Sequence, residues 1–320
     1  MCPAWKKIRE KNKLTFPNVS PQDSDTLLPV GFIGLGKMGG GMLENLLSKG
    51  VSVHIYDKQE SLKSYYKKKG AKVHNSPAEV SQKVECIFLC LPFTPQVSKV
   101  LFGEDGISST ANKGLTVIDA STILYKDALK FRKKLRKSRI EYCDCPISGL
   151  PKRAKEGSLT MMFGGPKQVY ERILPYLMLM GDFIIYSGKC GSGQLMKALN
   201  NVVYNINIAA ISETLPVAVK LGLDPKKLAK LFTSASSRSF ASEHFIPKML
   251  SRDFLGDYSM NLAYKDIQNV RDATADFSSA MPVFNSMVQT YEEAIKTGLG
   301  DESKNAMLKV YERKLGLKIK

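Results

Sequence analysis

Residues 30 to 39 read Val30-Gly31-Phe32-Ile33-Gly34-Leu35-Gly36-Lys37-Met38-Gly39. The apolar start, with its β-branched residues, is typical of a buried strand, and the apolar residues that follow recur at helical spacing as far as Ser48-Lys49-Gly50. Between strand and helix stands G-x-G-x-x-G. A dinucleotide pyrophosphate needs this arrangement, because glycines permit the tight turn, the close backbone approach and the packing of helix on strand. The sequence predicts a cofactor site formed by Gly34, Leu35, Gly36, Lys37, Met38 and Gly39.

A second strand is predicted at Val51 to Asp57, and it ends in a carboxylate. Asp57 stands about 20 residues beyond the first glycine, the spacing of an acid that accepts hydrogen bonds from the adenosine ribose. Such a carboxylate repels the 2′-phosphate of NADP, so we expect NAD. The next residue, Lys58, weakens that preference and leaves NADP open. The alternative interpretation is that Asp57 only starts a turn.

Strands and helices continue to alternate along the first half of the chain. The pattern predicts an α/β Rossmann-type doubly wound sheet, mostly parallel, with ligands at the carboxyl ends of its strands. Helices are predicted at Ser61–Lys69, after Ser76-Pro77, and at Tyr125–Lys137. The further strands are expected around Val73 and at Cys86–Pro92, Leu115–Asp119, Ile140–Pro146, Leu159–Phe163 and Phe183–Tyr186.

The character of the sequence changes near Gly191. From Gln194 to about Leu221 it is apolar nearly all round, which predicts a long buried helix with a kink or joint at Pro216. The rest is helical by pattern. We therefore predict three parts: a basic extension at residues 1–29, a dinucleotide-binding domain at 30–191, and an all-α domain for substrate binding and oligomerisation at 192–320.

The composition is that of a globular protein, with 43% hydrophobic and 24% charged residues among 320. No apolar run reaches the ~18 residues that span a bilayer. The cysteines form neither C-x-x-C nor a regular framework, which predicts reduced thiols inside the cell. With three scattered histidines they form no ligand set, so no metal site is predicted. The six cysteines are Cys2, Cys86, Cys90, Cys143, Cys145 and Cys190.

The net charge of +17 raises the question of a nucleic-acid partner. Lysines and arginines are spread over predicted helix faces, such as residues 63–72 and 126–139, and no aromatic residues are interleaved with them. We predict solvated basic faces that help to steer an acidic substrate, with no nucleic acid and no membrane as partner.

Residues 1–29 are basic, are interrupted by prolines and carry no periodic apolar face, which predicts an extension outside the folded core. They contain no apolar segment of the kind found in secretory signals. The lysines at 6–13 faintly resemble a mitochondrial presequence, but arginine and serine are not enriched there. We therefore expect a cytoplasmic protein, with the mitochondrial matrix as the alternative.

Two places combine residue types that suit chemistry. Lys197 and Asn201 are four residues apart, hence on one helix face. Burial lowers the pKa of a lysine and makes it a proton exchanger near neutral pH, although a lysine at a helix start can also reach solvent. The second place is the Ser148-Gly149 turn after a strand, where backbone N–H groups and a hydroxyl can bind a carboxylate. The alternative there is an ordinary turn.

These motifs resemble those of the β-hydroxyacid dehydrogenase family, which includes 3-hydroxyisobutyrate dehydrogenase, tartronate semialdehyde reductase and the glyoxylate/succinic semialdehyde reductases. The resemblance runs from about Gly31 to near the C-terminus and includes a C-terminal half similar to that of 6-phosphogluconate dehydrogenase. The stretches that carry it are Gly31–Gly39, Leu91-Pro92, Asp119–Thr122, Asp144–Gly149, Gly191–Asn201 and Tyr264–Asp266.

The resemblance implies a role for each matching residue. Lys197 is implied as the general acid and base. Substrate contacts are implied for Ser148, Gly149, Asn201 and Thr122, with Ser239 and Phe240 as weaker candidates. Cofactor contacts are implied for the glycine stretch and for Asp57, Lys58, Leu91, Pro92, Thr122, Lys265 and Asp266. Many members have a second glycine where this chain has Leu150, so we expect Leu150 to shape the substrate pocket.

The resemblance implies an NAD(P)-dependent oxidoreductase for a small β-hydroxyacid or its semialdehyde, assembled as a homodimer or homotetramer. Imine reductases share the architecture but replace the family lysine, which Lys197 argues against. A non-catalytic dehydrogenase-like binding module is the third alternative, and members of that kind have also lost the lysine.

Overall fold

The computed structural model describes residues 27–110, 112–255 and 258–319, so nearly all of the predicted basic extension at 1–29 lies outside the described residues. By its contacts the chain divides into two compact units. Among the described residues, unit one contains those up to Thr122 and Asp127–Gly193, and unit two contains Ile123–Lys126 and those from Gln194 onward. The short segment Ile123–Lys126 belongs to unit two, and within that unit the Ile123 N–H donates to Gln194 Oε1 at 3.2 Å.

Unit one is built on a sheet in the order β3-β2-β1-β4-β5-β6-β8-β7, with β9 paired to β8. Strands β1 to β6 run parallel, and β8 is antiparallel to both β6 and β7. The parallel Rossmann-type sheet is confirmed. The strands are β1 (Val30–Ile33), β2 (Val53–Tyr56), β3 (Lys72–Val73), β4 (Cys86–Leu89), β5 (Thr116–Asp119), β6 (Glu141–Asp144), β7 (Ile147–Ser148), β8 (Leu159–Gly164) and β9 (Gly181–Gly188).

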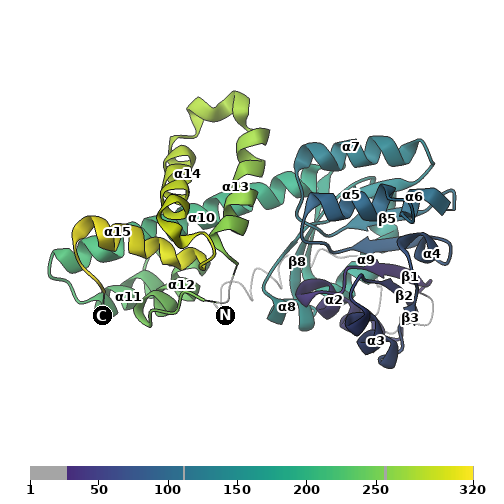
Figure 1. The fold of residues 1–320 in the computed structure, drawn as a ribbon, viewed down its shortest axis with the longest axis horizontal. Helices are drawn as coiled ribbons and strands as arrows, with labels where there is room; N and C mark the ends of the chain where they lie inside the picture. The colour runs from purple at the N-terminus through teal and green to yellow at the C-terminus, as the bar shows by residue number, and fades with distance from the viewer. Residues whose placement is uncertain (1–26, 111, 256–257, 320) are drawn as a thin grey trace. The chain divides into compact units, whose positions relative to one another are not determined.

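The helices of unit one cover both faces of this sheet, with α2, α3 and α8 on one face and α5, α6 and α7 on the other (Figure 1). The predicted helix start at Ser76-Pro77 is confirmed, since the Ser76 hydroxyl accepts from the Glu79 N–H. The helices are α2 (Lys37–Ser48), α3 (Glu60–Lys68), α4 (Pro77–Ser81), α5 (Thr94–Phe102), α6 (Ile107–Thr110), α7 (Tyr125–Arg136), α8 (Pro151–Lys155) and α9 (Lys167–Met180).

The regular secondary structure in the described part of unit two is helical, apart from one isolated bridge between Ser259 and Ser303, and the all-α prediction is confirmed. Its longest helix, α10 (Ser192–Lys220), runs through Pro216 without ending there. The others are α11 (Pro225–Ser234), α12 (Phe240–Leu250), α13 (Met260–Ala273), α14 (Pro282–Ala294) and α15 (Leu308–Leu315), with short helical turns at Ala275–Ala280, Ile295–Leu299 and Lys304–Met307.

Helix α10 is buried over only part of its surface, so the prediction of burial on every side holds only in part. Ile208 and Leu215 are fully buried in the core of unit two, whereas Leu199 is 50% and Val203 61% exposed. By length and composition α10 could cross a membrane, and 44% of its most apolar 18-residue window is buried inside the fold. Since α10 supplies core residues to unit two, we interpret it as a core helix.

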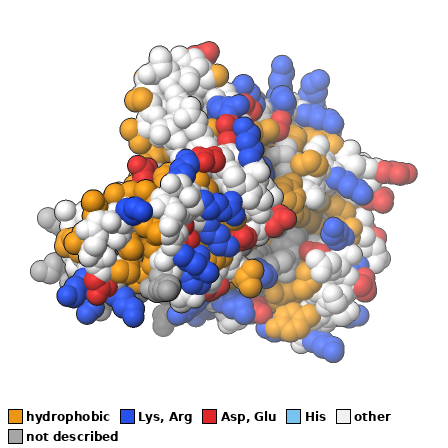
Figure 2. Space-filling model, turned by 60° about the vertical axis from the view of Figure 1, so that its left-hand side comes forward, with side chains coloured by type: hydrophobic (Ala, Val, Ile, Leu, Met, Phe, Trp, Pro, Cys, Tyr) orange, Lys and Arg blue, Asp and Glu red, His pale blue; other side chains and the backbone are white. Residues whose placement is uncertain are grey.

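The basic residues are not gathered into one stripe on the face that Figure 2 shows. Lysine and arginine side chains stand among acidic ones there. Ion pairs within the described residues include Lys69–Glu44 (2.5 Å) and Lys314–Glu293 (2.6 Å). Exposed pairs of this kind each contribute little to stability, about 0–1 kcal/mol.

Two histidines stack at the edge of the sheet in unit one. The Nδ1 of His54 on β2 lies 2.8 Å from the Nε2 of His74, which follows β3. Burial, followed by the neighbouring His74, Lys72 and Lys83, lowers the pKa of His54 to about 4. Burial also lowers the pKa of His74, while Glu79 acts in the opposite direction. The fold therefore holds both imidazoles neutral at pH 7.

This pair makes acid stability a test of the fold. As the pH falls from about 6.5 toward 4, unfolded His54 takes up a proton and folded His54 resists it, so the free energy of unfolding should fall by roughly 2–3 kcal/mol. Denaturant titrations of wild type and His54→Gln at each pH isolate this effect, because carboxyl titrations cancel in the difference. A difference that stays constant from pH 7.5 to 4.5 would contradict it.

Candidate functional site

The glycine turn joins β1 to α2, and two of its glycines are required by packing. Gly34 has φ +95°, and a Cβ there would lie 2.3 Å from the Cys90 carbonyl oxygen. A Cβ on Gly39 would lie 2.0 Å from the Gly34 carbonyl oxygen. At Gly36, by contrast, a Cβ would meet nothing within 4 Å. The middle glycine therefore opens onto free space, as the approach of a pyrophosphate requires.

The N-terminus of α2 is suited to an anion. Gly36 is its N-cap, no side chain caps it, and no acidic residue lies in its first turn. The first N–H groups of a helix lack partners within the helix and carry the positive end of its dipole. Together with the open space at Gly36, these groups fit the pyrophosphate of NAD(P).

Asp57 follows β2 and is 9% exposed. Its Oδ2 accepts from the Leu35 N–H at 2.8 Å and its Oδ1 accepts from the Gln59 N–H at 2.8 Å. Asp57 thus starts the turn that contains Gln59, and it also holds the glycine turn in place through Leu35. Each carboxylate oxygen can accept a further hydrogen bond, so a ribose contact remains compatible with this geometry.

The carboxyl ends of β4 and β5 carry the next predicted residues. Leu91 and Pro92 follow β4, and the Leu91 N–H donates to the hydroxyl of Ser121, which follows β5. Leu91 also lies beside the glycine turn, because its Cδ2 would be 2.9 Å from a Cβ on Gly34. Thr122 ends this stretch and is half-buried.

The Ser148-Gly149 turn lies at the same edge of the sheet, but the local structure differs from the prediction. The strand predicted at Ile140–Pro146 ends at Asp144, and Ser148 closes a separate short strand, β7. Since β8 is antiparallel to both β6 and β7, these two strands run in one direction and end at the same edge. Gly149 has φ +146°, which glycine alone adopts readily, and Leu150 is 38% exposed.

Helix α8 follows the Ser148-Gly149 turn in the chain and packs against α2, the helix that follows the glycine turn. A Cβ on Gly41 of α2 would lie 2.9 Å from the Ala154 carbonyl carbon. The Asn45 side chain of α2 donates to the Ala154 carbonyl oxygen at 2.7 Å. Unit one therefore places the predicted carboxylate-binding turn and the predicted cofactor helix in one packed arrangement.

In unit two, Lys197, Asn201 and Tyr204 share one face of α10, since they are four and three residues apart. Asp266 of α13, which is 5% exposed, lies at this face: its Oδ2 accepts from Asn201 at 3.2 Å and from the Tyr258 hydroxyl at 2.9 Å. Burial lowers the pKa of Lys197, and the Asp266 carboxylate opposes that shift. A lysine with a lowered pKa is suited to exchange protons near neutral pH.

Three other predicted residues of unit two have partners there. Lys265 Nζ lies 3.5 Å from Asp266 Oδ1. The Ser239 hydroxyl caps α12 by accepting from the Ser242 N–H at 3.1 Å, which explains its place in the sequence without a ligand. Phe240 is 55% exposed and packs on Tyr204, with ring centroids 5.7 Å apart.

Sequence reasoning missed two groups of polar residues. It did not foresee that Tyr258 bonds Asp266 or that Asp266 bonds Asn201. It also gave no role to Asp119 and Tyr142, which bond each other inside unit one at 2.7 Å. The sequence marked Asp119 and Asp266 only as members of the stretches Asp119–Thr122 and Tyr264–Asp266, and it did not indicate their partners, which come from distant segments.

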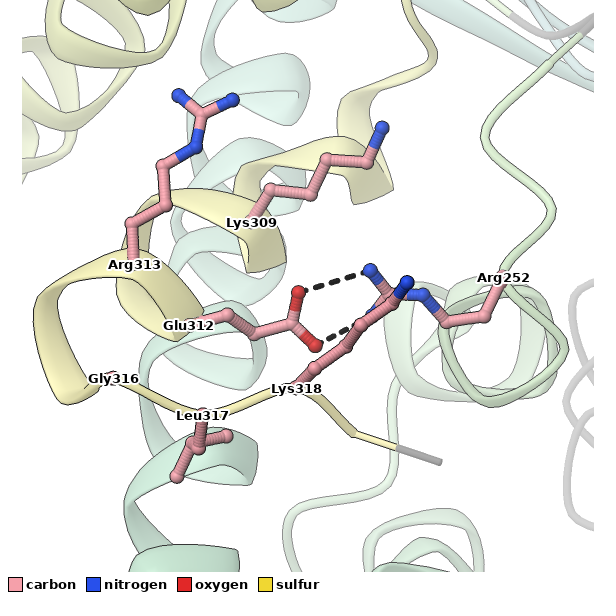
Figure 3. Close-up of a pocket in the computed structure, with 7 residues that line it drawn as sticks. All are labelled: Arg252, Lys309, Glu312, Arg313, Gly316, Leu317 and Lys318. Carbon is pink, nitrogen blue, oxygen red and sulfur yellow. Dashed lines mark hydrogen bonds and ion pairs between the residues drawn. The ribbon is translucent and has the colours of Figure 1, made fainter.

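A cavity of about 560 Å³ in unit two contains none of the predicted site residues (Figure 3). Glu312 lines it and accepts from both ends of the Arg252 guanidinium, at 2.5 and 3.0 Å. We assign this cavity no chemistry, because the Glu312 carboxylate that lines it is already paired with Arg252. The other lining residues are Lys309, Arg313, Gly316, Leu317 and Lys318.

The described cysteines are free thiols, and most are buried. Burial raises the pKa of Cys86 and of Cys90 to about 12, so neither is a nucleophile at neutral pH. Within residues 27–110, 112–255 and 258–319, no group of three His, Cys, Asp or Glu side chains is placed to hold a metal ion.

A Rossmann-type unit with an open glycine turn, followed by a helical unit with a half-buried lysine of lowered pKa, is typical of dinucleotide-dependent dehydrogenases. Residues 29–188 match the family described as the NAD binding domain of 6-phosphogluconate dehydrogenase, and residues 191–311 match the one described as NAD-binding of NADP-dependent 3-hydroxyisobutyrate dehydrogenase. The chain belongs to the β-hydroxyacid dehydrogenase family of NAD(P)-dependent oxidoreductases.

Two curated relatives are similar over almost their whole lengths. The chain is 35% identical to the probable mitochondrial 3-hydroxyisobutyrate dehydrogenase of Dictyostelium discoideum, with 92% of this chain and 94% of that protein covered. It is 33% identical to the 2-(hydroxymethyl)glutarate dehydrogenase of Eubacterium barkeri, with 91% and 97% covered. The relatives thus include proteins named as mitochondrial and proteins of bacteria.

Solved structures agree with this family. The 3-hydroxyisobutyrate dehydrogenase of Mycobacterium tuberculosis, solved with L-serine, gives a TM-score of 0.80 at 27% identity, with 89% of this chain and 99% of that chain covered. Psf3, solved with NADP+ and 2-OPP, gives 0.77 at 25% identity, with 88% and 99% covered. An imine reductase from Pseudomonas sp. shares the fold alone, at 17% identity and a TM-score of 0.58, with 88% and 98% covered.

Proposed function

We propose that this protein is an NAD(P)-dependent dehydrogenase that interconverts a small β-hydroxyacid and its semialdehyde. The observation that carries the proposal is Lys197, whose pKa is lowered by burial. It shares a face of α10 with Asn201, which donates to the Asp266 carboxylate of α13. The open glycine turn, which fits a dinucleotide, supports it. The names of the relatives favour hydroxyacid substrates over imines.

We propose the following division of labour. Bound NAD(P) supplies or accepts the hydride. Lys197 Nζ holds the proton that the substrate carbonyl oxygen takes up on reduction, and it receives that proton back on oxidation. Asp266 keeps Asn201 oriented through their 3.2 Å hydrogen bond, and Asn201 in turn orients the substrate oxygen.

The remaining site residues bind and orient in this proposal. Ser148 and Gly149 bind the substrate carboxylate through the hydroxyl and backbone N–H groups, and the exposed Leu150 limits the size of the substrate. Thr122 contacts substrate and cofactor, and Phe240 is a weaker substrate candidate. Lys265 and Asp266 contribute to cofactor binding from unit two, whereas we give Ser239 only a capping role.

A panel of small hydroxyacids and semialdehydes, each assayed with NAD and with NADP, tests the proposed function. We expect turnover of at least one β-hydroxyacid. Leu150→Gly should raise the turnover of larger acids, which fill the new space, and should not raise that of compact ones. Failure of the wild-type protein to bind NADH or NADPH, or turnover of cyclic imines in place of hydroxyacids, would refute it.

Asp57 should make NAD the preferred cofactor, because its carboxylate repels a 2′-phosphate. We expect Asp57→Asn to shift the NAD-to-NADP ratio of kcat/KM toward NADP by about tenfold or more, since a buried like-charge contact is removed. The asparagine oxygen can still accept one of the two backbone N–H groups. Lys58→Ala is the matched control and should shift the ratio toward NAD. Equal shifts in one direction from both variants would contradict this explanation.

We further propose that the protein forms a homodimer or homotetramer in the cytoplasm, with the mitochondrial matrix as the alternative compartment. The exposed apolar side chains Leu199, Val203 and Val217 along α10 support assembly. The reduced-thiol composition supports an intracellular location. Light scattering of the purified protein and fractionation of cells that express it test these two points.

A further inference from the structure

Asp119 is a fully buried carboxylate that the proposed mechanism does not use. It ends β5, and both of its oxygens are hydrogen-bonded. Oδ1 accepts from the Ser121 N–H at 2.9 Å, and Oδ2 accepts from the Tyr142 hydroxyl at 2.7 Å. No cation is paired with Asp119 within the described ranges. Burying a carboxylate without an opposite charge is costly, so the presence of Asp119 in the core calls for a functional explanation.

A continuous set of contacts leads from Asp119 to the glycine turn. The Ser121 side chain bonds Asp119, and its hydroxyl oxygen accepts from the Leu91 N–H at 2.9 Å. Leu91 then packs against the position of Gly34, whose φ of +95° begins the turn. The carboxylate therefore sets the place of Leu91 through Ser121, from strands that lie side by side in the sheet.

Two opposing effects act on the pKa of Asp119: burial favours the protonated form, and the hydrogen bonds to its oxygens favour the ionised form. The pKa of Asp119 is raised to about 6: burial is the largest cause, the bonds from Ser121 and Tyr142 offset part of the rise, and Asp144 across the β5–β6 register adds to it. The other titratable groups that face it are the thiols of Cys90 and Cys145. Ionised Asp119 is the stronger acceptor for the hydrogen bonds from Ser121 and Tyr142, so these bonds should weaken below about pH 6.

We infer that Asp119 is a positioning residue for the dinucleotide: acting through Ser121, it holds Leu91-Pro92 against the glycine turn and thereby sets cofactor affinity. The inference rests on the proposed function, because it concerns the same cofactor site. It assigns Asp119 no contact with the reacting atoms.

The test is the dissociation constant of NADH, measured by fluorescence titration of the purified protein without substrate. Asparagine keeps the shape of Asp119 but presents an N–H₂ group to one of its two donors. We expect Asp119→Asn to weaken NADH binding about 5- to 100-fold, which corresponds to the loss of one buried hydrogen bond. Ser121→Ala should weaken it similarly, and the double variant should be no weaker than the worse single one, since both break the same path.

Tyr142→Phe is the matched control, because it removes a hydrogen bond from the other oxygen of the same carboxylate and leaves Ser121 in place. It should lower the melting temperature while NADH affinity stays within about twofold. Wild type should bind NADH more weakly at pH 5.5 than at pH 7.5, and Asp119→Asn should lose that dependence.

Two results would overturn the inference: wild-type NADH affinity in both Asp119→Asn and Ser121→Ala, or an equal loss in Tyr142→Phe. If Asp119→Asn fails to fold, the Ser121→Ala affinity alone decides, a loss supporting the inference and wild-type binding refuting it. A wild-type protein that binds no NADH refutes the proposed function instead, so the two failures are distinguishable.

Discussion

Replacing Lys197 with methionine is expected to lower kcat by about 10²- to 10⁴-fold, the contribution of one general acid or base. NADH affinity should stay near that of wild type, because the glycine turn and the open N-terminus of α2 belong to unit one. Methionine fills a similar volume without a proton to exchange, so the fold of α10 should survive. Steady-state kinetics, an NADH titration and a melting curve measure the three quantities.

Two further lysine variants sharpen this test. Lys197→Arg keeps the positive charge but cannot release its proton, so it should be almost as slow as the methionine variant. Lys220→Met changes a lysine at the other end of the same helix, which contacts the Leu315 carbonyl, and should keep the wild-type kcat. Near-normal turnover by Lys197→Met would show that another group moves the proton.

Adding one methyl group at Gly39 is expected to have the largest effect on stability. The new Cβ would lie 2.0 Å from the Gly34 carbonyl oxygen, and no side-chain rotation can relieve this clash because that oxygen belongs to the backbone. Overpacking of this kind costs about 3 kcal/mol. Denaturant titration of Gly39→Ala should show this loss of unfolding free energy, or the variant should fail to fold.

Gly36→Ala is the matched substitution, three residues earlier in the same turn. Its Cβ would meet no protein atom within 4 Å, so the unfolding free energy should change by less than about 1 kcal/mol. NADH affinity should still fall at least tenfold, because the methyl group occupies the space through which the backbone approaches the pyrophosphate. Wild-type affinity in Gly36→Ala would show that no dinucleotide lies at this turn.

The elements that the sequence predicted well are those with a local cause. Strand β1, the glycine turn and α2 follow from a short apolar run, three glycines and a helical period, all within twenty residues. The start of α4 follows from one serine and one proline. Seven further strands were placed, and β4 and β5 among them follow from continuous apolar runs, which mark buried parallel strands.

The parts that sequence reasoning missed depend on partners far along the chain. Asp266 binds Asn201 across 65 positions, and Asp119 binds Tyr142 on the neighbouring strand. Nothing local encodes such pairs. Strand β7 was missed because two residues carry no period, and the partial exposure of α10 was missed because composition does not say which neighbours cover a helix. The roles proposed for Lys197 and Ser148 stay predictions.

The placement of Ile123–Lys126 in unit two has a consequence for engineering. The chain passes from one unit to the other after Thr122, after Lys126 and after Gly193, so no single cut separates the units. A fragment that starts at Gln194 lacks Ile123, which is 2% exposed and whose N–H donates to the Gln194 amide oxygen. A chimera that exchanges unit two between relatives must therefore also exchange residues 123–126, which lie between the two sequence segments of unit one.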